Sequence, residues 1–120
     1  MLAVLEPKRR EALENILAEY LKVKKTIHEP ARFAILELLA LGNPLDYNGI
    51  KDTLRLSDGN LHSHLSKLEE KGYVTSVKGF VGKKPRTEYS LTRSGLTELK
   101  QYLATVISTL KTMESRVPHG

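Results

Sequence analysis

Residues 56–74, LSDGNLHSHLSKLEEKGYV, combine a stripe of leucines with a face of small polar side chains. At about 100° per residue, Leu61, Leu65 and Leu68 lie on one side of a helix. The opposite side carries Gly59, Asn60, Ser63, Ser66, Lys67 and Glu70. Short side chains let a helix approach a partner closely, and their amide and hydroxyl groups can form hydrogen bonds with it. We therefore expect this face to bind a partner, with an ordinary solvated helix as the alternative.

A cationic segment follows this helix. Residues 73–95 hold five basic residues and one acidic residue, a net charge of +4, whereas residues 26–72 hold five basic and seven acidic residues. Lys83, Lys84 and Arg86 crowd one short stretch, where folding gives three like charges no evident benefit. A local basic patch favours a polyanionic partner, although a solvated lysine-rich loop has the same composition.

Hydrophobic periodicity predicts the helices that hold these two groups, at residues 7–25, 30–41, 47–54, 57–71 and 92–114. The second of them is apolar nearly all round, so we expect it to be central and buried. Ser57 or Asp58 is expected to cap the helix with the polar face, and Gly72 to end it. Thr92 is expected to cap the last helix.

After Gly72 the period changes to that of strands. Residues 73–78 and 87–91 have strand composition, and residues 79–85 are expected to form the loop of a hairpin because they include two glycines and a proline. We expect Phe80 to pack at the base of this hairpin. Residues 44–46 could add a third strand. Clustered helices followed by a hairpin with a basic loop form the winged helix-turn-helix arrangement, an α+β fold that is mainly α with a small β hairpin.

Length and composition limit the class of protein. The chain has 120 residues, enough for a single domain, residues 1–120, with one modest core. No apolar run approaches the roughly 20 residues that span a membrane, the start lacks a secretory h-region, and there is no cysteine for disulfides. These features favour a cytoplasmic protein. No nucleophile with a base, phosphate-binding loop or acid pair occurs in a recognisable frame, so we predict no enzyme and no cofactor.

The segments PARFAILELL, LSDGNLHSHLSKLEEKGYV and KGFVGKKPRTEYSLTRSG resemble the small prokaryotic winged-helix transcriptional regulators related to the MarR and ArsR groups. The resemblance covers about residues 28–96, within an expected winged-helix core at 27–95. It implies a homodimer in which the helix at 57–71 enters the DNA major groove. It also implies that the hairpin at 73–91, the wing, lies along or in the minor groove. The flanking helices, 7–25 and 92–114, vary most within such families.

On this interpretation the short polar face reads double-stranded DNA. Asn60 can pair with adenine through two hydrogen bonds, Ser63 can bond to bases or phosphate, and Lys67 can reach guanine or phosphate. Asp58 is interpreted as a cap, because its charge suits a helix N-terminus and repels phosphate. The expected backbone or flanking contacts are Ser57, Gly59, His62, His64, Lys78, Lys83, Lys84, Arg86 and Arg93.

The last helix carries an apolar seam that indicates a dimer. Its apolar residues, from Leu96 to Met113, recur at alternating steps of 3 and 4. A helix of this length is roughly 33 Å long, more than a small core can cover, so pairing with a twofold mate would bury the seam. Packing on its own core as a monomer is the alternative. The expected interface residues are Leu13, Ile16, Leu17, Tyr20, Leu99, Leu103, Val106, Leu110 and Met113.

Three other possibilities remain at this point. A winged-helix adaptor for protein–protein contacts would use the same fold, but Glu70 is the only acid well inside the polar face, and adaptors usually leave that face acidic or apolar. A histidine-based metal sensor is weakly supported, because His62 and His64 do not share a helix face and the other histidines lack a carboxylate cluster. No metal site is predicted. A small-molecule effector is compatible with the sequence, which identifies no pocket for it.

Overall fold

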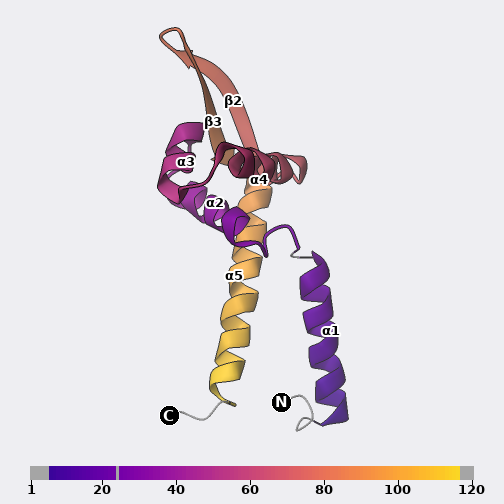
Figure 1. The fold of residues 1–120 in the computed structure, drawn as a ribbon. Helices are drawn as coiled ribbons and strands as arrows, with labels where there is room; N and C mark the ends of the chain where they lie inside the picture. The colour runs from indigo at the N-terminus through magenta and orange to yellow at the C-terminus, as the bar shows by residue number, and fades with distance from the viewer. Residues whose placement is uncertain (1–5, 24, 117–120) are drawn as a thin grey trace.

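A computed structural model of the protein describes residues 6–23 and 25–116, without the side chains of residues 19–23. Its elements are α1 (Pro7–Val23), α2 (Pro30–Leu41), β1 (Leu45–Asp46), α3 (Tyr47–Leu54), α4 (Asp58–Glu70), β2 (Val74–Val81), β3 (Lys84–Leu91) and α5 (Arg93–Glu114). The hairpin of β2 and β3 projects from one end of the helical core (Figure 1). The predicted mainly α winged-helix fold is confirmed.

The helices around the core begin at residues whose side chains accept hydrogen bonds from their first turns. Glu29 caps α2, Asp46 caps α3, Ser57 caps α4 and Thr92 caps α5, each through the amide three residues further on. Such caps satisfy amides that a helix otherwise leaves unpaired. Of the two candidates for the cap of α4, Ser57 is therefore the cap, and Asp58 is the first helical residue.

The core lies where α2 meets the other helices and the sheet. α2 contributes Ile35, Leu36 and Leu39, each 0% exposed, which confirms its predicted central position. α4 turns its leucine stripe to the same core. Because fully burying a leucine contributes about 1.5–3 kcal/mol, this stripe fixes which face of α4 is left outside. Other buried hydrophobic residues of the core are Ile27, Ile50, Leu61, Leu65, Leu68, Val74, Tyr89, Leu99 and Tyr102.

The sheet is antiparallel, in the order β1-β3-β2, which confirms the predicted third strand. The two long strands pair along their full length, with Val81 opposite Lys84 at the tip. The prediction of a loop at residues 79–85 is therefore wrong, since only Gly82 and Lys83 make the turn. Gly82 has a φ of 63°, and two-residue hairpin turns require a positive φ at their first residue. Gly82 thus allows a two-residue turn where a loop of seven residues was predicted.

The base of the hairpin is joined to the start of α5 by close contacts. The Thr92 hydroxyl donates to the Gly72 carbonyl at 2.6 Å, and the Thr92 amide donates to the Tyr73 carbonyl at 3.0 Å. The same hydroxyl accepts a hydrogen bond from the Gly95 amide at 3.0 Å. A Cβ on Gly95 would meet the Tyr73 carbonyl oxygen and would lie 2.8 Å from Leu91 Cδ1. We call Gly72, Tyr73, Thr92 and Gly95 the wing clamp.

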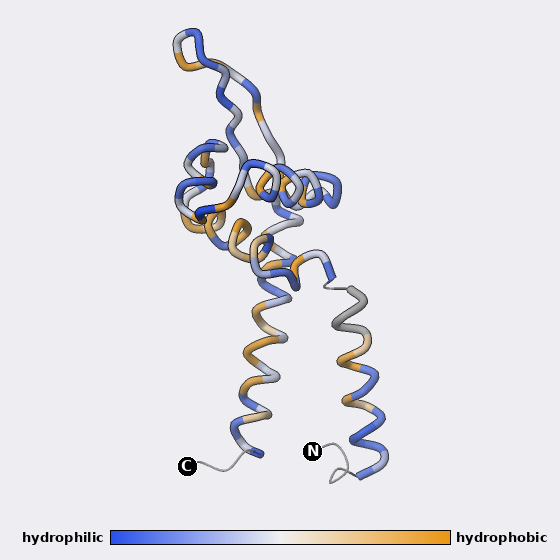
Figure 2. Tube along the Cα trace, viewed as in Figure 1, coloured by the Kyte–Doolittle hydropathy of each residue, from blue (hydrophilic) through white to orange (hydrophobic). Residues whose placement is uncertain are grey.

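α1 and the second half of α5 extend from the core at the end opposite the wing (Figure 1). Apolar stretches recur along both helices in this region (Figure 2). α1 ends at Val23, two residues before its predicted end, and Lys24 lies outside the described residues. Among the described residues, the helices are too short or too polar for any of them to cross a membrane.

Candidate nucleic-acid interface

The polar side chains on the outer face of α4 are exposed and have no partners among the residues that the structure describes. Asn60, Ser63 and Lys67 are all exposed, and their side chains form no hydrogen bond or ion pair with the residues that the structure describes. Gly59 adds open space beside them, because a Cβ there would meet no atom within 4 Å. The structure thus places the three predicted base-reading residues together on one accessible face.

The first turn of α4 is braced against α3. Lys51 Nζ lies 3.0 Å from Asp58 Oδ1, and the Tyr47 hydroxyl donates to the same carboxylate at 3.2 Å. The hydrogen bond to Lys51 lowers the pKa of Asp58 and raises the pKa of Lys51. The negative charge of Asp58 is therefore compensated within the protein. This supports the prediction that Asp58 is not a base reader, although Ser57 and not Asp58 is the cap of α4.

The two histidines of α4 have different surroundings. His62 is exposed, whereas the side chain of His64 is 18% exposed. His64 Nδ1 lies 3.2 Å from a guanidinium nitrogen of Arg32 and 3.7 Å from Glu29 Oε2. Arg32 also donates to the Thr26 carbonyl at 2.6 Å. His64 therefore connects α4 to the start of α2, and of the two histidines His62 is the one available at the surface.

Ser57 and Arg93 occupy helix starts. The Ser57 hydroxyl accepts the Asn60 amide at 3.2 Å, which leaves its proton free for an outside acceptor. Arg93, the first residue of α5, is exposed and lines a shallow hollow with Asn43 and Lys100. Ser57 therefore lies at the edge of the α4 face, whereas Arg93 belongs to a different element.

The wing carries the cations. Lys78, Lys83 and Lys84 are exposed and have no ion pair with any described residue. Arg86 Nε lies 3.6 Å from Glu88 Oε1, so the one acidic residue of the hairpin is already engaged. The three lysines of the hairpin therefore keep uncompensated positive charge at the surface.

The prediction that Phe80 packs at the base of the wing is wrong. Phe80 is 74% exposed and lies opposite Pro85, close to the turn. It was expected in a loop, whereas β2 continues to Val81 and carries it beyond the core. Alternation along the strand could have located it, because Phe80 shares a face with the buried Val74 but lies six residues, roughly 20 Å, further out.

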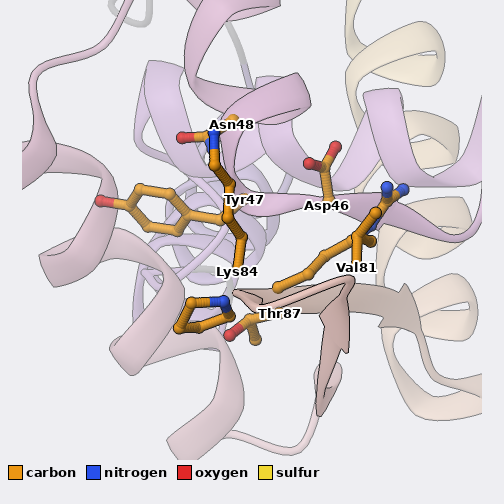
Figure 3. A pocket seen from close by; sticks show the side chains of 8 residues that line it. Asp46, Tyr47, Asn48, Val81, Lys84 and Thr87 are labelled. Carbon is orange, nitrogen blue, oxygen red and sulfur yellow. The ribbon is translucent and has the colours of Figure 1, made fainter.

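A shallow hollow separates the start of α3 from the wing (Figure 3). Asp46, Tyr47 and Asn48 line one side, and Val81 and residues 84–87 line the other. Lys84 and Arg86 make the wing side cationic, and the exposed Asn48 presents an amide in the first turn of α3. Such donors suit a phosphate. Asn48 was missed from the sequence, although its position at a helix start is a signal for it.

The apolar seam of α5 divides into a core part and an exposed part. Leu99 is 4% exposed and packs in the core, together with Tyr102. The prediction of Leu99 as an interface residue is therefore wrong, because its own chain leaves it almost no surface for a partner. Leu103 packs partly against the same core. The exposed part, towards the end of α5, consists of Val106, Ile107, Leu110 and Met113, each 40–52% exposed, and Leu96 in the first turn is 38% exposed.

Apolar residues on α1 are exposed as well. Ile16 is 59% and Leu17 38% exposed, and Leu13 is partly exposed. The side chain of Tyr20, also predicted at the interface, lies outside the described residues.

Ile107 on α5 was missed, because counting alternate steps of 3 and 4 passes over the residue beside Val106. A helical wheel includes it on the same broad stripe.

Comparison with known proteins finds one family, one relative and two solved structures that are similar to this chain. The winged helix DNA-binding domain family matches residues 31–110. An uncharacterized protein of Methanocaldococcus jannaschii is 33% identical over 90 residues, which are 75% of this chain and 98% of that protein. The structure is similar to that of the transcriptional regulator homologue protein from Pyrococcus horikoshii OT3, with a TM-score of 0.74 and 29% identity over 81% of this chain and 95% of that one. It is also similar to Bacillus subtilis PadR in complex with operator DNA, with a TM-score of 0.57 and 26% identity over 62% of this chain and 48% of PadR.

Proposed function

The chain belongs to the winged helix DNA-binding domain family, and from this premise we propose that it is a dimeric transcriptional regulator that reads double-stranded DNA by sequence. In this proposal α4 enters the major groove and the wing contacts the adjacent backbone or minor groove. The observation that carries it is an uncommitted polar face on α4 beside an uncompensated cationic wing. The Ser76 hydroxyl of the wing donates to Glu69 of α4 at 3.0 Å, which ties the two surfaces together.

The base contacts are assigned to Asn60, Ser63 and Lys67. An asparagine amide matches the adjacent acceptor and donor of adenine, and an ammonium matches the acceptors of guanine. The neighbouring Gly59 removes bulk, so that the backbone of α4 can approach the groove. Because all three side chains are exposed and unpaired among the described residues, they lose no internal hydrogen bond when DNA replaces water.

The backbone contacts are assigned to the groups around this face. Phosphate contacts position the protein and make binding depend on salt, because each neutralised phosphate releases condensed counterions. Asn48 and Lys84 bound the hollow of Figure 3, which offers a place for one phosphate. The other proposed contacts are Ser57, His62, Lys78, Lys83, Arg86 and, on α5, Arg93. His64 is proposed to hold α4 against α2 instead.

The dimer is proposed to form through α1 and the exposed part of α5. The exposed apolar residues on both helices supply a surface that a twofold mate would bury. A twofold dimer presents two copies of α4 to half-sites about one helical turn, roughly 34 Å, apart. A near-palindromic operator is therefore expected.

Selection of bound duplexes from a random pool tests this proposal. The expected result is a near-palindrome, and Asn60→Ala should bind it more weakly while discriminating less at one position of each half-site. A pool with no enriched site would contradict sequence-specific reading and would favour the adaptor interpretation.

The wing is tested by the salt dependence of binding. Lys83→Ala combined with Lys84→Ala should weaken binding to every duplex and reduce the slope of log K against log salt by about 1.8, at roughly 0.9 per phosphate contact. The matched control is Lys100→Ala combined with Lys111→Ala, which removes the same charge from exposed positions on α5. If both double variants change the slope equally, net charge and not the wing determines binding.

A further inference from the structure

The outer part of the wing carries apolar side chains as well as cations. Phe80 is 74% exposed, Val77 69% and Val81 57%. Phe80 lies opposite Pro85, so a ring and a pyrrolidine stand next to each other close to the turn. An exposed apolar group of this size on a long two-stranded projection is a feature of binding surfaces.

Strand alternation assigns these residues to two faces of the hairpin. Ser76, Lys78 and Phe80 share one face, because side chains two apart along a strand point the same way. The Ser76 hydroxyl reaches Glu69 of α4, so this is the face on the side of α4. Val77 and Val81 point to the other face. Phe80, with Pro85 opposite, therefore stands on the α4 side, four residues or roughly 13 Å beyond the contact between wing and α4.

We propose that the Phe80–Pro85 pair enters the DNA minor groove next to the major-groove segment that α4 reads, with the ring against deoxyribose and base edges. This inference rests on the proposed function. The major groove is about 12 Å wide, so a hairpin that extends roughly 13 Å beyond its contact with α4 is long enough to cross the flanking phosphate strand into the adjacent minor groove. Apolar side chains, phenylalanine and proline among them, are inserted there by other minor-groove proteins.

Charge favours DNA over a protein as the occupant. Lys78 precedes Phe80 on the same face, and Lys83 follows it in the turn, so cations bracket the ring on both sides. Glu88, the one acid of the hairpin, is paired with Arg86. An apolar centre bracketed by lysines matches the sugar surface of a groove with a phosphate strand on each side.

Fluorescence anisotropy with a duplex that the parent protein binds tests the inference. Phe80→Ala should raise Kd on the order of tenfold, because the buried ring area is lost, with no change in the salt slope, because no charge is removed. The matched control is Val77→Ala on the same strand, which removes a similarly exposed apolar side chain from the other face. This control should leave Kd unchanged. Both variants should melt at the parent temperature, since both side chains are exposed.

The groove is identified with inosine. Replacing guanine by inosine in the base pairs that flank each half-site removes an amino group from the minor groove alone. This substitution should change the affinity of the parent protein and leave that of Phe80→Ala unaltered. An equal response of both proteins would overturn the minor-groove assignment.

Three other outcomes would also overturn the inference. Binding by Phe80→Ala as tight as that of the parent would remove Phe80 from the DNA contact while leaving the proposed function intact. Equal losses in Phe80→Ala and Val77→Ala would indicate a general effect on the wing. A change in the mass of the free protein on Phe80→Ala, measured by sedimentation, would assign the ring to a protein contact. Failure of the parent to bind any duplex, by contrast, would refute the proposed function as well.

Discussion

Replacing Gly95 by alanine perturbs the wing clamp with a single methyl group. The added Cβ would meet the Tyr73 carbonyl oxygen, and it would lie 3.0 Å from the Tyr73 carbonyl carbon and 2.8 Å from Leu91 Cδ1. Two of these three atoms are backbone, so no side-chain rotation can relieve the contact. α5 and the base of the hairpin must move apart, which strains the hydrogen bonds of Thr92 to Gly72 and Tyr73.

The expected loss of stability is the sum of two destabilising contributions and one stabilising contribution. Overpacking of this kind costs typically 1–3 kcal/mol, and the weakened hydrogen bonds add about 1 kcal/mol. Alanine is better than glycine in a helix by roughly 0.5–1 kcal/mol. The net result is a destabilisation of about 2 kcal/mol, which for a chain of this size lowers Tm by roughly 8 °C.

Thermal and urea unfolding followed by circular dichroism measure this effect, at one protein concentration because the stability of any self-associating protein depends on concentration. Gly59→Ala is the matched control, since it makes the same change in a helix where a Cβ meets no atom within 4 Å. It should be neutral or stabilise by up to about 1 kcal/mol. If Gly95→Ala were as stable as Gly59→Ala, the close packing of the clamp, and the reasoning from it, would be refuted.

Two further predictions concern the start of α2 and the exposed seam. Burial raises the pKa of Glu29, but hydrogen bonds from the amides of Arg32 and Ala31 and the charges of His64 and Arg32 outweigh it and leave the pKa below its ordinary value of 4.5. The charged cap therefore stabilises the fold above pH 4.5, and this contribution is lost as the pH falls further. Glu29→Gln should be less stable than the parent by roughly 0.5–1 kcal/mol at pH 7 and by less at pH 3.5. Urea titrations at both pH values measure the difference. Leu110→Glu should convert the proposed dimer to a monomer in sedimentation velocity, whereas Ser108→Glu, on the opposite side of α5, should not. A parent protein that is itself monomeric would contradict the proposed interface.

The helices and the third strand could be predicted because their signals are local. Hydrophobic period, caps and glycine stops depend on neighbouring residues, and the leucine stripe of α4 lies on the core as its spacing indicated. The prediction of the wing was wrong because glycine and proline do not by themselves indicate a loop. Glycine and proline between residues 79 and 85 suggested a loop, but only Gly82 has a positive φ, and the other residues fit an extended strand.

The remaining differences between prediction and structure come from long-range packing that no local pattern encodes. Leu99 belongs to the apolar seam by spacing, yet the core reaches as far as Tyr102 along α5 and covers it. His64 is predicted to flank the DNA contact from its place on α4, and the structure adds that it lies against Glu29 and Arg32, more than 30 residues earlier in the sequence. In both cases the sequence indicated approximately which face of the helix carries the residue, and the tertiary packing determined which neighbour lies against it.

α5 is one unbroken helix from Arg93 to Glu114, and its two ends have different neighbours. The first turn is fastened to the wing through the Thr92 hydrogen bonds, and the last turns carry the exposed apolar residues. Because every turn of a helix is held by its own backbone hydrogen bonds, α5 joins these two regions as one continuous element. In the proposed dimer, the angle at which two copies of α5 cross would therefore set the direction in which each wing points. The same angle would set the spacing between half-sites, so a change in one of these quantities would also change the other.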